Sequence, residues 1–161
     1  MIKVYYAGKI NKNDWRHILY KNLRGANSPI INDNLIYNGP FFISCDHGCY
    51  HGENSHGVGT NKDVCEIEMN KSKTEAFINC INYINDSDIV FAYINSMDCY
   101  GTIAEIGYAY SERKEIYIAV DSKLKNKIND LWFVLQMANK MTVNNDIVEA
   151  HNEFKKWLGG K

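Results

Sequence analysis

Two acidic residues are the side chains in this sequence that are best placed to do chemistry. Asp98 comes shortly after an apolar run at residues 88–94, and Glu105 lies in a predicted helix that follows a turn at Gly101 and Thr102. A short apolar run of this kind is typical of a strand buried in a parallel sheet. Open α/β sheets bind ligands at the carboxyl ends of their strands, so we expect both acids to converge there.

A pair of carboxyl groups at such an edge suits cleavage of a bond at the anomeric carbon of a sugar. One carboxylate can stabilise the positive charge that develops on the sugar, or bond to it covalently, while a second acid serves the leaving group. Different surroundings can keep one group ionised and the other protonated at the same pH. The alternative is structural, because acidic residues are also favoured at the N-terminus of a helix.

The residues around these acids resemble a known enzyme family. The chain is similar to nucleoside 2-deoxyribosyltransferases, and to their relatives that hydrolyse the N-glycosidic bonds of nucleotides, over residues 2–10 and 72–120. The resemblance is carried by Asp98-x-x-Gly101-Thr102-x-x-Glu105-x-Gly107-x-Ala109 and by Val4-Tyr5-Tyr6-Ala7-Gly8. It implies that Glu105 is the nucleophile, that Asp98 handles proton transfer or the leaving base, and that Tyr5 orients Glu105.

One departure from the family pattern bears on the predicted substrate-binding residues. Many members carry a further aspartate on the helix before the central strand, where this chain has Asn79 and Cys80. An asparagine can donate a hydrogen bond in place of that carboxylate, and the change favours hydrolysis over transfer to a second base. The predicted substrate-binding residues are Gly8, Gly101, Thr102, His47, His51 and Asn79.

Two other functions remain open. The first is a glycohydrolase that acts on nucleoside monophosphates or on a nicotinamide dinucleotide, which would present the same acids to water. The second is a nucleotide-binding or zinc-binding module without turnover. Cys99, inside the motif, could in principle act as a nucleophile, but its flanking residues Asp98 and Tyr100 offer no cation to stabilise a thiolate.

A segment rich in cysteine, histidine and glycine lies between residues 40 and 66. Thiolate and imidazole are preferred zinc ligands, so Cys45, His47, Cys49 and His51 form a candidate metal site. A straight strand would spread these four residues over roughly 20 Å, and one ion could bind them only if the segment folded back on itself. A loop that brings His47 or His51 to the substrate is the alternative, and purely structural roles are a third.

Composition limits the remaining possibilities. The 161 residues suit a single domain over residues 1–161, with an irregular insertion at about 28–70. Lys and Arg number 18 against 19 Asp and Glu, which gives no electrostatic case for binding duplex nucleic acid or an anionic membrane. We predict a cytoplasmic enzyme that acts on a small nucleoside or nucleotide without a cofactor, and the resemblance implies a homodimer or larger homo-oligomer.

Hydrophobic periodicity predicts alternating strands and helices. This alternation is typical of a mainly parallel sheet, here of five strands, covered by helices on both faces as in flavodoxin-like and Rossmann-like folds. Trp132 and Phe133, on a late helix, are expected in the core or at a subunit contact. The predicted strands are at residues 2–7, 35–44, 88–94 and 116–120, and the predicted helices at 15–23, from 72 or 74 to before 88, 102–113, 129–140 and 147–158.

Overall fold

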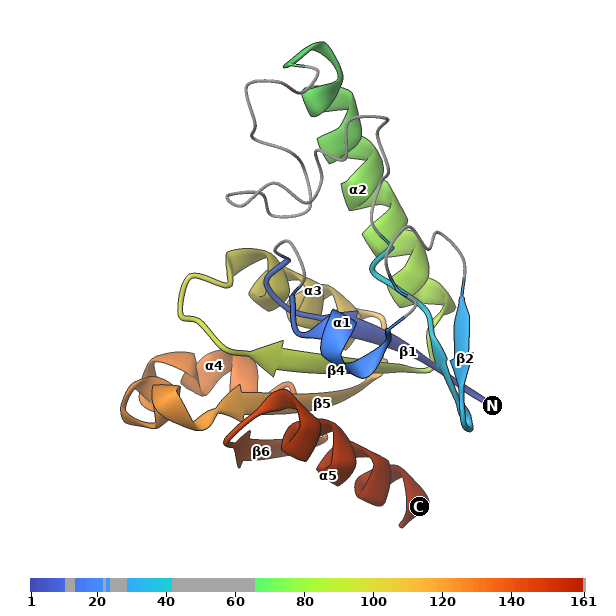
Figure 1. The fold of residues 1–161 in the computed structure, drawn as a ribbon. Coiled ribbons are helices and arrows are strands. Elements are labelled where there is room, and N and C mark those ends of the chain that lie inside the picture. Colours follow the sequence, from blue (N-terminus) through green and yellow to red (C-terminus); the bar gives the residue numbers. More distant parts are fainter. Residues whose placement is uncertain (11–13, 22, 24–28, 42–65, 161) are drawn as a thin grey trace.

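The core of the molecule is a six-stranded sheet with the strand order β2-β3-β1-β4-β5-β6. It is seen in a computed structural model that describes the chain except for residues 11–13, 22, 24–28, 42–65 and 161 (Figure 1). β2 is antiparallel to β3, and every other neighbouring pair is parallel. The mainly parallel α/β sheet is therefore confirmed, while six strands replace the predicted five. The strands are β1 (Ile2–Ala7), β2 (Ile30–Asn32), β3 (Leu35–Tyr37), β4 (Ile89–Ile94), β5 (Glu115–Asp121) and β6 (Lys140–Asn144).

Both edge strands, β2 and β6, lie where the sequence predicts no strand. β2 falls between a predicted helix and a predicted strand, and it pairs with β3 through a turn in which Asp33 takes a φ of 53°. Short aspartate side chains tolerate this left-handed conformation. The first part of the predicted insertion at 28–70 therefore belongs to the sheet. β6 follows the region predicted as a helix at 129–140, which instead holds a 3-10 segment (Ser122–Leu131) and the single turn α4 (Trp132–Leu135).

The helices agree with the predictions in order but differ at their ends. α1 (Arg16–Leu19) is one turn, shorter than predicted, because the backbone becomes extended at Tyr20. α2 (Glu66–Asp86) begins before residue 72, and α3 (Tyr100–Ser111) begins one residue before Gly101. Gly101 and Thr102 therefore lie in the first turn of α3 rather than in a turn before it. α5 (Ile147–Gly159) matches its predicted range closely, and Asp146 caps its first turn.

Alternation along the strands gives the two faces of the sheet different compositions. The face beneath α1 and α5 is aromatic, and the face beneath α2, α3 and α4 is mostly aliphatic. The strands supply Tyr6, Tyr37, Phe91, Tyr93 and Tyr117 to the aromatic face. They supply Tyr5, Ala7, Val90, Ala92, Ile94, Ile116, Ile118 and Val120 to the aliphatic face. Tyr5 is therefore the one aromatic residue that the strands contribute to the aliphatic cluster.

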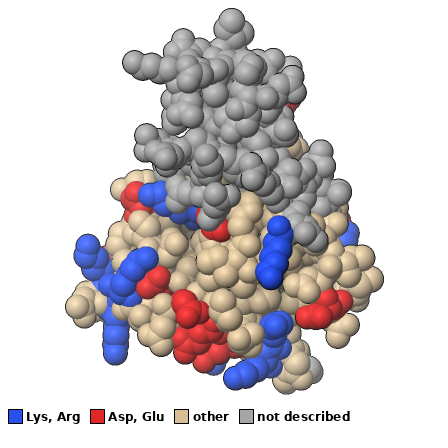
Figure 2. All heavy atoms as spheres, viewed as in Figure 1, with Lys and Arg blue, Asp and Glu red and all other residues tan. Residues whose placement is uncertain are grey.

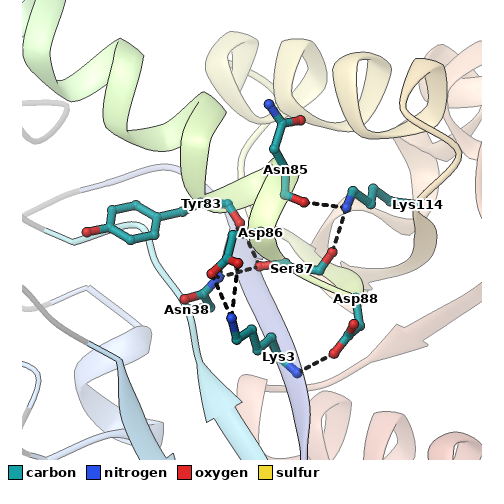
Figure 3. Close-up of polar contacts among 8 residues, drawn as sticks. All are labelled: Lys3, Asn38, Tyr83, Asn85, Asp86, Ser87, Asp88 and Lys114. Atoms are coloured by element: carbon teal, nitrogen blue, oxygen red, sulfur yellow. Dashed lines mark hydrogen bonds and ion pairs between the residues drawn. The ribbon is translucent and has the colours of Figure 1, made fainter.

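A polar cluster fastens the C-terminal end of α2 to the sheet (Figure 3). Lys3 of β1 pairs with Asp86 at 3.0 Å, and its backbone N–H donates to Asp88 at 2.8 Å. Lys114 donates to the carbonyl oxygens of residues 85 and 87, at the end of the helix where carbonyl groups lack helical partners. Asn38, after β3, donates to Ser87 at 3.0 Å. These bonds hold α2 in position over β1.

The surface carries both signs of charge. Lys and Arg side chains lie among Asp and Glu side chains on the face seen in Figure 2, in agreement with a formal net charge of −1. No helix in the described part of the chain combines the length and hydropathy that a membrane span requires.

Candidate active site

The site lies where the direction of strand addition reverses. From β1 the chain goes to β3 on one side and then returns to β4 on the other, so the carboxyl ends of β1 and β4 flank a switch point in the topology. Ligands of open α/β sheets bind at such points. The residues that follow these strands, from Gly8 and from Asn95, and the start of α3 all meet there.

Tyr5 and Glu105 are in direct contact at this switch point. The phenol oxygen of Tyr5 donates a hydrogen bond of 2.5 Å to Oε1 of Glu105, which joins β1 to the second turn of α3. Burial, and then the negative charge of Glu105, raise the pKa of Tyr5 well above its usual value, so Tyr5 keeps its proton and remains the donor. The contact fixes the orientation of the glutamate side chain.

Glu105 itself is half-buried, and its environment holds two opposing influences. Burial raises the pKa of Glu105 to about 7, while the hydrogen bond from Tyr5 and the positive charge of Arg16 act in the opposite direction. A carboxyl group with such a pKa exchanges its proton near neutral pH, a property that enzymes use in nucleophiles and general acids.

Asp98 does not contact Glu105. Its carboxylate pairs with the ammonium group of Lys9 at 2.5 Å and accepts a hydrogen bond from Ser96, and no hydrogen bond joins the two carboxyl groups, both of which the structure describes. The bonds from Lys9 and Ser96 lower the pKa of Asp98 to about 2. Asp98 is exposed and ionised at neutral pH, so it accepts hydrogen bonds in this state rather than supplying a proton.

Cys80, to which the sequence assigns no role in the site, belongs to the neighbourhood of the Tyr5–Glu105 pair. It lies on α2 and interacts with the phenol of Tyr5, and burial followed by the negative charge of Glu105 raises the pKa of its thiol to about 12. The thiol is therefore protonated and unreactive at neutral pH. Asn79, the predicted substrate-binding residue one position earlier, is exposed on the same helix.

The predicted binding residues at the ends of β1 and in α3 have different surroundings. Gly8 is buried, and a Cβ atom there would come within 2.7 Å of the Trp15 ring, so the indole requires the glycine. A Cβ on Gly101 would meet no atom within 4 Å. Thr102 is buried, and its hydroxyl oxygen has no hydrogen-bond partner among the residues that the structure describes. Cys99 is buried beside Asp98, and burial raises the pKa of its thiol, which does not favour a nucleophilic role.

The predictions for the cysteine- and histidine-rich segment concern residues outside the described part of the chain. Cys45, His47, Cys49 and His51 lie outside the described residues, so the candidate zinc site and the two histidine contacts remain predictions. Within the described part of the chain, no group of three or more His, Cys, Asp or Glu residues could hold a metal ion.

A described surface pocket lies at the opposite edge of the sheet. It has a volume of about 600 Å³ and is lined by the end of α3 and by residues 136–139, close to the starts of β5 and β6. Tyr5, Glu105 and Asp98 do not line it. We therefore identify the candidate site from its chemistry and its place in the topology rather than from this pocket.

The arrangement of strands and helices defines an α/β protein with a switch point between β1 and β4. A solved structure with a similar fold is that of the Clostridium botulinum CMP N-glycosidase, BcmB, which aligns with a TM-score of 0.53 over 96% of this chain and 98% of that chain. The two sequences are 14% identical, so the comparison establishes a shared fold. No protein-family model and no curated protein matches the chain.

Proposed function

We propose that this chain cleaves the N-glycosidic bond of a nucleotide or nucleoside, with water as the preferred acceptor. The observation that carries the proposal is the hydrogen bond from Tyr5 to Glu105 at the switch point of the sheet. The full-length similarity in fold to a CMP N-glycosidase supports it, and it favours a nucleoside monophosphate as substrate. We also propose that residues 1–161 act as one domain of the nucleoside 2-deoxyribosyltransferase type.

In the proposed reaction Glu105 attacks the sugar. An oxygen of its carboxylate bonds to C1′ while the C1′–N bond breaks, and the base leaves with the bonding electrons and takes up a proton. Water then attacks C1′ and releases a proton, the bond between C1′ and the Glu105 oxygen breaks, and the sugar or sugar phosphate leaves the regenerated carboxylate. The raised pKa of Glu105 means that the reactive, ionised form accumulates as the pH rises through about 7.

Tyr5 and Asp98 would serve this reaction differently. Tyr5 restrains Glu105 and, as a hydrogen-bond donor, favours its ionised form. Asp98 is ionised and can accept a hydrogen bond from the base or from a sugar hydroxyl. It can transfer a proton only after Lys9 has moved away and its pKa has risen. Gly101, Thr102, Asn79, His47 and His51 remain proposed substrate contacts.

A panel of substrates tests the proposal. The protein is incubated with CMP, dCMP, cytidine, other nucleoside monophosphates and NAD, with and without a second free base, and products are separated by chromatography. Release of a base from at least one compound supports N-glycosidic cleavage, and formation of a new nucleoside would show transfer. Thermal stabilisation by a nucleotide without any product would instead indicate a binding module.

We further propose that the chain forms a homo-oligomer that involves Trp132 and Phe133. Their side chains are 64% and 63% exposed, so the expectation that they lie in the core is wrong for this arrangement of the chain. Their rings contact each other edge to face, with centroids 5.5 Å apart. Paired exposed aromatic residues are common at protein interfaces. Sedimentation of the wild type and of Trp132→Gln tests this, because the oligomer of the variant is expected to dissociate at a higher protein concentration than that of the wild type.

A further inference from the structure

Arg16, at the start of α1, is a fully buried arginine with a partner at each of its three side-chain nitrogen atoms. Its Nε donates to the carbonyl oxygen of Tyr6 at 2.8 Å, and its Nη2 donates to the carbonyl oxygen of Gly8 at 2.7 Å. Its Nη1 pairs with the carboxylate of Asp14 at 2.7 Å, and both side chains are almost entirely removed from water. Burying a charge costs free energy unless it is paired and hydrogen-bonded, so this site is built around the guanidinium group.

The two carbonyl groups that Arg16 binds lie beyond the point where β3 stops pairing with β1. The last matched pair is Val4 with Tyr37, and the backbone N–H of Tyr6 then donates to the carbonyl of Gly39. Alternate residues of a strand direct their N–H and C=O groups to the same neighbour, so Tyr6 and Gly8 follow Val4 on the β3 side. The chain continues into Pro40, which has no N–H to donate. Arg16 therefore takes the place of a strand along the end of β1.

This part of β1 also carries the candidate active site. Tyr5 precedes Tyr6 directly, and its side chain emerges on the opposite face of the sheet, where it meets Glu105. Trp15 completes the support, because its ring packs against Gly8 and lies 4.5 Å from the guanidinium carbon of Arg16. A change in the backbone at Tyr6 or Gly8 would displace the Tyr5 phenol.

Arg16 also acts on Glu105 through its charge. The positive charge of Arg16 lowers the pKa of Glu105 and so opposes the effect of burial. Asp14 pairs with the same guanidinium group and partly neutralises that charge. The influence of Arg16 on the carboxyl group is therefore reduced by the ion pair with Asp14.

We propose that Arg16 is a positioning residue for the N-glycosidic reaction: it binds the backbone at the end of β1 and so holds Tyr5 where it meets Glu105. Its buried charge acts on Glu105 in addition. The inference rests on the proposed function. Asp14 moderates the charge and aligns the guanidinium fork, and Trp15 holds the fork against Gly8.

Three variants separate the geometric part of this inference from the electrostatic part. Arg16→Gln removes both the charge and the fork that binds the two carbonyl groups. Loss of the fork should lower kcat/KM about 100-fold, the cost expected of a small misplacement of catalytic groups. Loss of the charge should move the acid limb of the pH profile of kcat/KM to higher pH. Arg16→Lys keeps the charge but cannot reach both carbonyls, so kcat should fall while the limb stays in place. Asp14→Asn leaves the charge of Arg16 unopposed, so the limb should move to lower pH. Arg113→Gln, at an exposed arginine, is the matched control and should behave as the wild type.

The opposite movements in Arg16→Gln and Asp14→Asn distinguish positioning from a merely structural role, because loss of folded protein would lower activity without moving the limb. Each rate is divided by the folded fraction from circular dichroism. If Arg16→Gln does not fold, Asp14→Asn and Arg16→Lys decide the question. An unmoved limb in Asp14→Asn, or rates within twofold of the wild type in Arg16→Lys, would overturn the inference.

A second measurement needs no turnover. Carbon-13 labelling of glutamate gives a carboxyl signal for Glu105, assigned by its loss in Glu105→Gln, and its titration is followed in the wild type and in Arg16→Gln. A midpoint that moves to higher pH in Arg16→Gln supports the inference, and an unmoved midpoint contradicts it. If no substrate is cleaved but the midpoint moves, the proposed function fails while the link between Arg16 and Glu105 stands.

Discussion

The two faces of the sheet use tyrosine in different ways. On the aromatic face Tyr6 contacts the hydroxyl of Tyr20 at 2.5 Å and the imidazole of His151 at 3.0 Å, and Tyr37 donates to the carbonyl of Pro40 at 2.6 Å. Tyr93, at the end of β4, is the exception on this face, because it donates to the carboxylate of Asp121 at 3.0 Å. On the aliphatic face Tyr5 donates to the carboxyl group of Glu105. Phenols with neutral partners stabilise a core, whereas Tyr5 holds a carboxyl group whose pKa is raised to about 7, which makes the pair a candidate for catalysis.

The difference teaches that neither burial nor residue type alone identifies a functional side chain. Tyr5, Tyr6 and Tyr37 are all fully buried, and burial is the largest cause of the raised pKa of each. What distinguishes these three tyrosines is the group to which each hydroxyl is hydrogen-bonded. The comparison between the two faces is therefore open to experiment at the level of single hydroxyl groups.

The largest expected effect is that of Glu105→Gln. The amide keeps the size of the side chain and can still accept the bond from Tyr5, but it cannot form the bond to C1′. We expect turnover to fall by about 1,000-fold or more, with an unchanged fold. Base release from the best substrate of the panel and circular dichroism measure the two outcomes. Activity close to that of the wild type would remove Glu105 from the proposed mechanism.

The next effect compares Tyr5→Phe with Tyr6→Phe. Tyr5→Phe leaves Glu105 without its donor, so turnover should fall by about 10- to 100-fold. Tyr6→Phe removes the bonds to Tyr20 and His151, so it should lower the free energy of unfolding by about 1–3 kcal/mol while turnover of the folded protein stays within about twofold. Rates and urea unfolding curves are measured for both. The comparison between the faces would be broken if Tyr6→Phe lost more activity than Tyr5→Phe.

The two faces should also respond to pH in opposite directions. Burial lowers the pKa of His151 from 6.5 to about 4, so between these values the unfolded chain binds a proton that the folded chain does not, and stability falls as the pH decreases. A displacement of this size corresponds to about 3 kcal/mol at about 1.4 kcal/mol per pH unit. Burial raises the pKa of Glu105 from 4.5 to about 7, so its contribution to stability is lost as the pH increases through that range.

Melting temperatures between pH 4 and pH 8 test both signs. His151→Gln should flatten the decline on the acid side, and Glu105→Gln should flatten the decline on the alkaline side. Each variant serves as the control for the other, because each should leave the opposite limb unchanged. Curves that run parallel to that of the wild type would show that neither group is perturbed as the structure indicates.

Much of the fold can be predicted from the sequence because its strongest patterns are local. Apolar runs near residues 2–7, 89–94 and 115–121 form the central strands, and the helical spacing after Ile147 forms α5. The edge strands β2 and β6 are harder to predict, since three to five residues at an edge depend on pairing with a neighbour more than on their own propensities. The helix predicted at 129–140 is wrong, because this region holds the end of a 3-10 segment and the single turn α4, and β6 begins at its last residue.

The candidate site is predictable only in part. The resemblance leads one to expect Tyr5 beside Glu105, and the structure has this contact, while their catalytic roles remain predictions. The pairing of Asp98 with Lys9 depends on how two loops meet, so spacing in the sequence does not reveal it. The role of Arg16 cannot be predicted from the sequence for a related reason, because a lone arginine on a short helix suggests a solvated side chain. Its burial is explained by the two carbonyl groups of the β1 end, which have no neighbouring strand to bind them.

The smallest effect that we predict sharpens the comparison on the aromatic face itself. Tyr37→Phe leaves the buried carbonyl of Pro40 without the phenol that binds it, so the free energy of unfolding should fall by about 1–3 kcal/mol. The ring should still stack on Tyr6, whose centroid lies 5.2 Å away, so the packing of this face is preserved. Turnover per folded molecule should equal that of the wild type, and urea unfolding measures the loss of stability. A tenfold loss of turnover would mean that a hydroxyl on the aromatic face reaches the reaction, and burial beside a neutral partner would no longer separate the structural phenols from Tyr5.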